Sequence, residues 1–230
     1  MPKKRPAQFR GSRRTAVRVY WAMWGLCAAV WLYPVGNDVI RIMEVILTAS
    51  CVVWTFILWW PARWLWGIAG LVTLLLIWPG RDYDRIALRE AIAARLPAYE
   101  GTRWVWGGEN FLGMDGPGLA RRSAIEGTAL HGLKTCNPRL LRMALSVWWS
   151  GFPSKSPDAK PPKTVRVVSA RNLHLADFAV YGNKEFEVYA GDGVWFCFHP
   201  DGYVSRTRDV NSASPFAATV YRWRYLEMPR

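Results

Sequence analysis

The chain has 230 residues, 51% of them hydrophobic and 20% charged, and its formal net charge at pH 7 is +13. This length allows one domain of about 100–150 residues plus a second region. The charge alone suggests a nucleic-acid binder, but seven basic residues lie within residues 1–18, directly before a hydrophobic stretch. Basic residues placed there mark the cytoplasmic end of a membrane helix and contact anionic headgroups. We therefore predict a cytoplasmic tail over 1–18 that contacts membrane lipid and no nucleic acid, with an RNA-binding arm as the competing interpretation.

Three apolar stretches follow the tail, at about 19–35, 43–60 and 63–79, and nine of the 15 tryptophans precede residue 80. A helix needs about 20 apolar residues to cross a bilayer, with a lower limit near 17. These stretches are short, but flanking Trp and Tyr side chains can anchor them at the interfaces. We predict an all-α transmembrane region of about three spans over 19–79, with a polar break at 37–44.

Two alternatives concern this region. A cleaved signal peptide is disfavoured, because no small-residue cleavage site precedes the polar break and two more apolar stretches follow. A re-entrant corner near Pro61 would reduce the number of full crossings. With the basic tail inside, three crossings of a cytoplasmic membrane place residues 80–230 on the extracytoplasmic side.

The region 80–230 has the pattern of an α+β domain, with helices first and strands after them. Helical spacing of apolar residues runs through 81–96, and further helices are expected after Asp115 and from Asn137 to about Trp149. Asp115 is a suitable helix cap, and Pro117 is tolerated in a first turn. Residues 150–164 contain four prolines and are predicted to be a loop. From Val165 onward the period is two, and five strands separated by glycine turns are expected.

The motif RWVWGGENFLGMDGPGL, residues 103–119, followed by EFEVYAGDGVWFCFHPDG, residues 185–202, resembles the NlpC/p-sixty family of papain-like cell-wall peptidases. That family has an aromatic-Val-Trp-Gly-Gly run, then Asp-Cys-Ser-Gly-Leu opening a helix, then a strand of the type His-Val-x-x-Tyr-x-Gly. The segment LHLADFAVY, residues 173–181, looks like the Gly-Asp-Leu strand that precedes the histidine. The resemblance implies a papain-like fold for most of residues 82–230 and relates the chain to the membrane-anchored branch.

The resemblance also implies where a cysteine nucleophile, its general base and the residue that orients the base would stand. In such a site the thiolate is favoured by the helix N-terminus and activated by a histidine. Carried over by position, these places are Gly116, Glu185 and Cys197. None of the three matches the chemistry, so we predict a natural pseudoenzyme of a peptidoglycan hydrolase family.

Several alternatives remain open at this point. A slip of register would make His174 or His199 the base, and Cys197 with His199 could form a relocated site on one strand face. Trp104 and Trp106, with Asp115 and His199, are candidates to line a cleft, although packing explains the tryptophans and a helix cap explains Asp115. Arg121 and Arg122 are expected to be solvated helix positions.

Cysteine and histidine usage favours no metal site and no cofactor, since there is no CxxC pair and no His-rich cluster. A bridge between Cys136 and Cys197 is conceivable in an oxidising compartment. The predicted function is binding of peptidoglycan stem peptide or of a protein partner by a membrane-anchored, catalytically inactive NlpC-type domain. The alternatives are a structural subunit of a larger membrane complex and an active cysteine peptidase with a relocated site.

Overall fold

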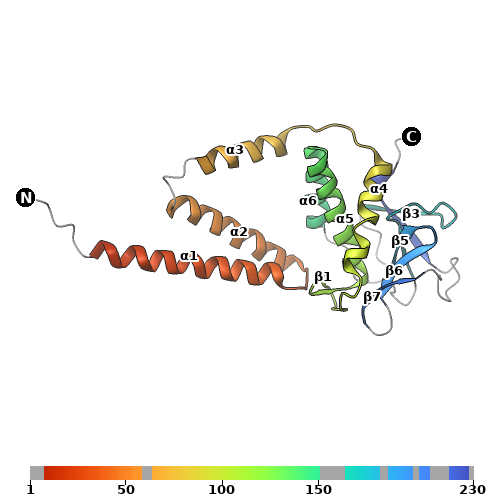
Figure 1. The fold of residues 1–230 in the computed structure, drawn as a ribbon, viewed down its shortest axis with the longest axis horizontal. Helices are drawn as coiled ribbons and strands as arrows, with labels where there is room; N and C mark the ends of the chain where they lie inside the picture. Colours follow the sequence, from red (N-terminus) through yellow and green to blue (C-terminus); the bar gives the residue numbers. More distant parts are fainter. Residues whose placement is uncertain are drawn as a thin grey trace, which may run out of the picture. The chain divides into compact units, whose positions relative to one another are not determined.

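A computed structural model describes residues 8–58, 64–150, 164–181, 186–198, 202–207 and 218–227. The chain forms two compact units (Figure 1). One contains Met1–Tyr33 and Asp38–Leu71, and the other contains Pro34–Asn37 and Val72–Arg230. The short loop 34–37, which joins the first two helices, therefore belongs to the C-terminal unit.

The N-terminal unit consists of α1 (Gln8–Leu32), α2 (Asp38–Leu58) and the first half of α3 (Trp64–Ile77). α1 and α2 pack side by side. The Trp31 indole N–H donates to Thr48 Oγ1 (3.1 Å), and the Thr55 hydroxyl donates to the Tyr20 hydroxyl (3.3 Å). The polar residues between the first two apolar stretches lie mostly within α2, which begins at Asp38, where a negative side chain complements the helix dipole.

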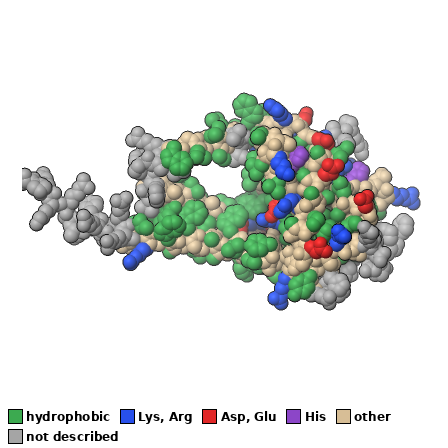
Figure 2. Space-filling view, viewed as in Figure 1, with side chains coloured by type: hydrophobic (Ala, Val, Ile, Leu, Met, Phe, Trp, Pro, Cys, Tyr) green, Lys and Arg blue, Asp and Glu red, His purple; other side chains and the backbone are tan. Residues whose placement is uncertain are grey.

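Two helices are long and apolar enough to cross a membrane, over Thr15–Leu32 and Asp38–Ile57. Only 6% and 17% of these windows are buried within the chain. A core helix of a soluble protein would be mostly buried, so these helices present their apolar side chains outward. In Figure 2 hydrophobic side chains cover these helices, whereas charged ones concentrate on the C-terminal unit.

The C-terminal unit is α+β, as predicted. Its helices are α4 (Arg85–Ala93), η1 (Leu96–Tyr99), α5 (Gly116–Lys134), α6 (Pro138–Ser150) and η2 (Arg224–Leu226). A small hairpin of β1 (Glu109–Asn110) and β2 (Gly113–Met114) precedes α5. Before the hairpin, Arg103 and Trp104 form isolated bridges with Tyr203 and Met114.

The main sheet is antiparallel, with strand order β3-β8-β4-β5-β6-β7. Its strands are β3 (Val165–Val168), β4 (Phe178–Val180), β5 (Phe186–Gly191), β6 (Val194–Phe198), β7 (Val204–Thr207) and β8 (Thr219–Trp223). The sequence prediction missed β7, the last strand of this sheet, which pairs with β6. On its other side Val204 exchanges backbone hydrogen bonds with Gly101 and Thr102 (both 2.9 Å). α5 packs against β5, and α6 packs on α5, so α5 lies between α6 and the sheet (Figure 1).

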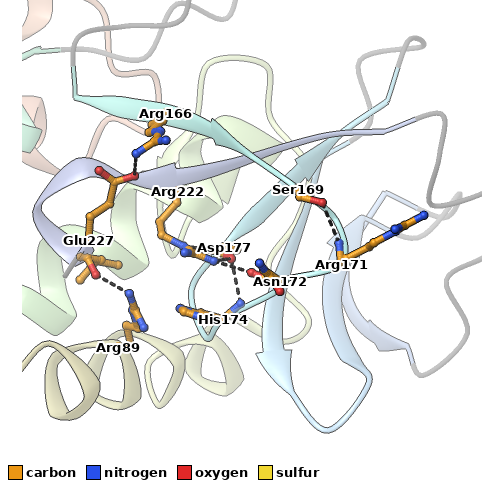
Figure 3. A network of polar contacts seen from close by, with 10 residues as sticks. Arg89, Arg166, Ser169, Arg171, Asn172, His174, Asp177, Arg222 and Glu227 are labelled. Carbon is orange, nitrogen blue, oxygen red and sulfur yellow. Dashed lines mark hydrogen bonds and ion pairs between the residues drawn. The ribbon is translucent and has the colours of Figure 1, made fainter. Parts of the chain in front are cut away.

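A buried ion pair fixes the centre of the sheet. Asp177, which is fully buried, accepts hydrogen bonds from Arg222 Nε (2.8 Å) and Nη2 (2.6 Å) and from the backbone N–H of His174 (2.8 Å). Figure 3 shows this network between β8 and the loop before β4. The Arg222 guanidinium also donates to the Asn172 carbonyl (2.6 Å). The pair thus fastens the β3–β4 connection to β8.

Replacing Asp177 with alanine should lower the free energy of unfolding by about 3–5 kcal/mol, because it leaves the Arg222 charge buried and unpaired. The double variant Asp177→Ala, Arg222→Met should be more stable than Asp177→Ala alone. Pulse proteolysis of the detergent-solubilised chain in urea measures both effects.

The matched control is Arg166, whose half-exposed guanidinium lies 3.2 Å from Glu227 at the edge of the same network (Figure 3). Arg166→Ala should cost less than about 1 kcal/mol, as for exposed pairs in general. An equal loss for Arg166→Ala and Asp177→Ala would contradict the central role of the buried pair.

Candidate functional site

The predicted site centres on Asp115, which caps α5. Its Oδ1 accepts from the backbone N–H of Gly118 (2.7 Å) and its Oδ2 from that of Gly107 (2.8 Å). One carboxylate therefore fixes both the start of the helix and the glycine turn before it. Burial raises the pKa of Asp115 to about 6, the two backbone N–H groups oppose that rise, and neighbouring Glu109 adds to it.

Glycines are required around this cap because backbone segments touch there. A Cβ on Gly118 would collide with the carbonyl of Gly108, and a Cβ on Gly108 would lie 2.5 Å from the carbonyl oxygen of Gly113. Gly107 has a φ of 71°, in the region that favours glycine. The double glycine and the Asp-Gly-Pro-Gly turn therefore serve the close packing of this corner.

Gly116 begins α5, is buried, and lies against the side chain of Phe186 at the start of β5. A Cβ built on Gly116 would collide with Phe186 Cβ and lie 2.9 Å from its Cγ and 3.1 Å from its Cδ2. The place that a nucleophilic side chain would occupy is therefore filled by an aromatic residue. Sequence reasoning missed Phe186. The alternation within EFEVYAG could have indicated it, because alternate residues of a strand face opposite sides of the sheet and Phe186 stands between the polar residues Glu185 and Glu187.

Cys197 lies on the opposite face of the sheet from this corner. It pairs with Glu187 across β5 and β6, whereas Phe186 shares its face with Val188 and Phe196, which face the helices. The Cys197 face carries Tyr181 and Trp195, and Tyr181 donates to the buried carboxylate of Glu187 (2.8 Å). The structure therefore does not bring Cys197 to Gly116.

The remaining candidates are distributed over the unit. Glu185 and His199 lie outside the described residues, so their positions stay predictions. His174 donates through its backbone to Asp177, and burial, followed by the charges of Arg222 and Arg89, lowers the pKa of its imidazole. His174 thus belongs to the structural network of Figure 3.

Trp104 and Trp106 are 45% and 60% exposed, with ring centroids 6.2 Å apart in an edge-to-face arrangement. They are therefore surface side chains rather than core residues. Cys136 and Cys197 are both free thiols, so no bridge joins them. Within the described part of the chain, no cluster of three or more His, Cys, Asp or Glu side chains could hold a metal ion.

Arg121 corrects the expectation of a solvated position. Its side chain is 2% exposed, pairs with Glu109, and donates through Nη2 to the carbonyls of Val147 (3.2 Å) and Trp148 (2.8 Å). Arg122 is partly exposed and pairs with Glu126 at 2.6 Å, one helical turn further on. The first turns of α5 thus hold the hairpin and the end of α6 together through Arg121.

Neither a scan of protein-family models nor a search of curated proteins finds a match to this chain.

Adding a methyl group at Gly116 should destabilise the domain by about 1–3 kcal/mol, as overpacking of a filled site does in general. The same change in a Phe186→Gly background should cost much less, because the colliding Cβ and the ring behind it are both gone. A double-mutant cycle of Gly116→Ala and Phe186→Gly, followed by pulse proteolysis, measures the coupling. Strictly additive costs would show that the two residues do not compete for space.

The Asp115 carboxyl should give a distinctive pH dependence. Its folded-state pKa of about 6 lies above the usual value of 3.8, so the folded state keeps the proton longer than the unfolded state. The stability contribution of this group is therefore fully present below about pH 4 and is lost as pH rises to about 6. The total loss is about 3 kcal/mol.

Asp115→Asn removes the titrating group. It also lowers the stability by an amount that does not depend on pH, because the asparagine NH₂ group faces the Gly107 N–H and cannot accept its hydrogen bond. The stability of the parent minus that of Asp115→Asn should fall between pH 4 and pH 6 and stay constant above. A difference that is flat over this range, or that rises with pH, would contradict the buried, proton-retaining carboxyl.

Proposed function

We propose that this chain is a membrane-anchored, catalytically inactive homologue of NlpC-type cell-wall peptidases, and that it acts by binding rather than by cleavage. The observation that carries the proposal is the contact between Gly116 and Phe186. The helix start retains its aspartate cap, but it has neither a nucleophile nor the space for one. An aromatic side chain in that space also disfavours a substrate peptide at the same point.

Local geometry supports the family resemblance. Ala176 stands where the Gly-Asp-Leu pattern has its glycine, and its φ is 66°, in the left-handed region. Asp177 follows it and is fully buried. A backbone conformation that favours glycine, found at the position where the resemblance places one, is expected if the chain descends from that pattern.

The bound partner is peptidoglycan stem peptide or another protein at the cell wall. The filled corner at Gly116 favours a protein partner over a peptide held in the ancestral site. A second candidate function is a structural subunit of a larger membrane complex, and the low burial of α1 and α2 within the chain favours it.

The backbone bonds of the loop 34–37 support an extracytoplasmic position for the domain. Gly36 N–H donates to the Gly107 carbonyl (2.8 Å), Glu109 N–H donates to the Pro34 carbonyl (2.8 Å), and Val35 bridges Gly108. The loop after α1 and the C-terminal domain therefore share one side of the membrane. With the basic tail inside, that side is the extracytoplasmic one, if α1 crosses.

The same bonds bear on the number of crossings. If α2 crossed and α3 did not, the domain would lie on the side opposite to the loop. Hence α2 and α3 either both cross or turn back together as a re-entrant pair. Helix α3 has 14 residues, about 21 Å of rise, so a crossing needs its flanking Trp64 and Trp78 at the interfaces.

Purified protein in liposomes should not cleave muropeptides that carry stem peptides, and Cys197→Ala should not differ from the parent. Mass spectrometry of the products measures cleavage. Cleavage by the parent that Cys197→Ala abolishes would overturn the proposal in favour of a relocated peptidase site. Cleavage that survives Cys197→Ala would overturn it as well.

Topology is tested with single cysteines in a background whose four native cysteines are serine. Asn37→Cys and Arg171→Cys should react with a membrane-impermeant maleimide from the same, extracytoplasmic side. Arg63→Cys should react only from the cytoplasmic side if α2 and α3 both cross. Labelling of Asn37→Cys and Arg171→Cys from opposite sides would contradict the shared side of loop and domain.

A further inference from the structure

Helix α6 has an apolar outer face that the described part of the chain leaves uncovered. Its inner face packs on the domain through side chains that include Leu140, Ala144 and Val147, which are all buried. On the outer side Leu145 and Trp149 are 51% and 59% exposed. They are four residues apart and so lie on the same face of the helix.

The first turns of α6 hold the chain where it leaves α3. Arg142 donates to the carbonyls of Trp78 and, at 2.9 Å, Pro79. The Asn137 side chain accepts from the Arg81 N–H (3.2 Å) and donates to the Arg81 carbonyl (2.9 Å). Trp78 is the residue that follows α3, so this end of α6 is fixed at the exit of that helix.

The last turn of α6 is connected to the loop that follows α1. Arg121 donates to the carbonyls of Val147 and Trp148 and pairs with Glu109. Glu109 in turn donates its N–H to Pro34, and its carboxylate packs on Gly36 so closely that a Cβ there would lie 2.8 Å from Oε1. Pro34 is two residues beyond the end of α1.

Both ends of α6 are therefore held near the apolar helices. The first turns contact the segment after α3 directly, and the last turn is linked to the loop after α1 through Arg121 and Glu109. One residue of extended chain spans about 3.5 Å, so Trp78 and Pro34 lie within about 10 Å of the ends of α3 and α1. A helix of 13 residues is about 20 Å long, and α6 runs between these two points.

A second apolar feature extends from the same loop. The turn of the β1–β2 hairpin carries Phe111 and Leu112, which are 64% and 51% exposed, and Trp106 nearby in sequence is 60% exposed. Glu109, the first residue of this hairpin, is the one bonded to Pro34. The exposed hairpin tip therefore lies only two or three residues along the chain from the residue that bonds the loop after α1.

We propose that the outer face of α6 and the tip of the β1–β2 hairpin rest in the headgroup region of the leaflet from which the domain emerges. The inference depends on the membrane anchoring proposed above. Tryptophan is enriched at membrane–water interfaces, where its ring lies at the level of the headgroups. The exposed Lys134 at the α5–α6 corner supplies positive charge for anionic headgroups.

The proposed contact would place α6 toward the bilayer. The sheet lies on the other side of α5 (Figure 1). Any partner at the cell wall would then meet the sheet and its loops rather than α6.

The test is depth measurement by spin labels in the full chain. Leu145→Cys and Trp149→Cys, each in the background without native cysteines, are labelled with a nitroxide and reconstituted in liposomes of phosphatidylethanolamine and phosphatidylglycerol. Arg171→Cys is the matched control, because Arg171 is exposed in the loop between β3 and β4 and points away from the network in Figure 3. Collision rates with oxygen and with a nickel chelate report lipid and water, respectively.

Labels at 145 and 149 should collide with oxygen at least several-fold more, relative to the nickel chelate, than the label at 171. Ratios equal to that at 171 would overturn the proposal. Protection of 145 and 149 from both reagents would also overturn it, in favour of a protein partner on α6. Flotation of the same liposomes distinguishes failure of the membrane anchor from failure of the interfacial contact. A chain that does not float refutes the membrane anchor. A chain that floats but has water-exposed labels refutes only the contact of α6 with the headgroups.

Discussion

The guanidinium of Arg121 connects the elements on which the rest of the domain depends. From the first turns of α5 it pairs with Glu109 of the small hairpin and donates to two carbonyls at the end of α6. A fully desolvated charge of this kind is tolerated only when carboxylate and carbonyl oxygens surround it. Its partners therefore have to stay together, and with them the hairpin, α6 and the loop 34–37 that pairs with the hairpin.

The corner beside Arg121 has a structural role that does not depend on catalysis. Asp115, the double glycine and Gly118 close a helix cap and a backbone crossing, and these stabilise the fold whatever stands at residue 116. Residue 116 has no side chain and Phe186 lies directly against it, so the corner is part of the packing between α5 and β5.

Two segments next to the apolar helices are held within the C-terminal unit itself. The loop after α1 forms backbone bonds with the hairpin, and the segment after α3 is held by Asn137 and by Arg142 of α6.

The sequence by itself determined the features that depend on neighbouring residues. Apolar length predicted the outward-facing helices α1 and α2, helical spacing predicted α5 and α6, and alternation predicted most of the strands. Asp115 was recognised as a cap because its partners lie within eight residues along the chain. Strand β7 was missed because a four-residue strand carries little periodicity of its own.

Only the tertiary structure decided the contacts between distant segments. Nothing in the local sequence indicates that Phe186 lies on Gly116, that Arg121 is buried, or that the loop after α1 pairs with Gly107–Glu109. The family pattern placed Cys197 with Gly116, yet the strand register puts it on the other face of the sheet, because alternate residues of a strand face opposite ways. Local propensity acts over a few residues, whereas register and packing depend on segments that meet only when the chain is folded.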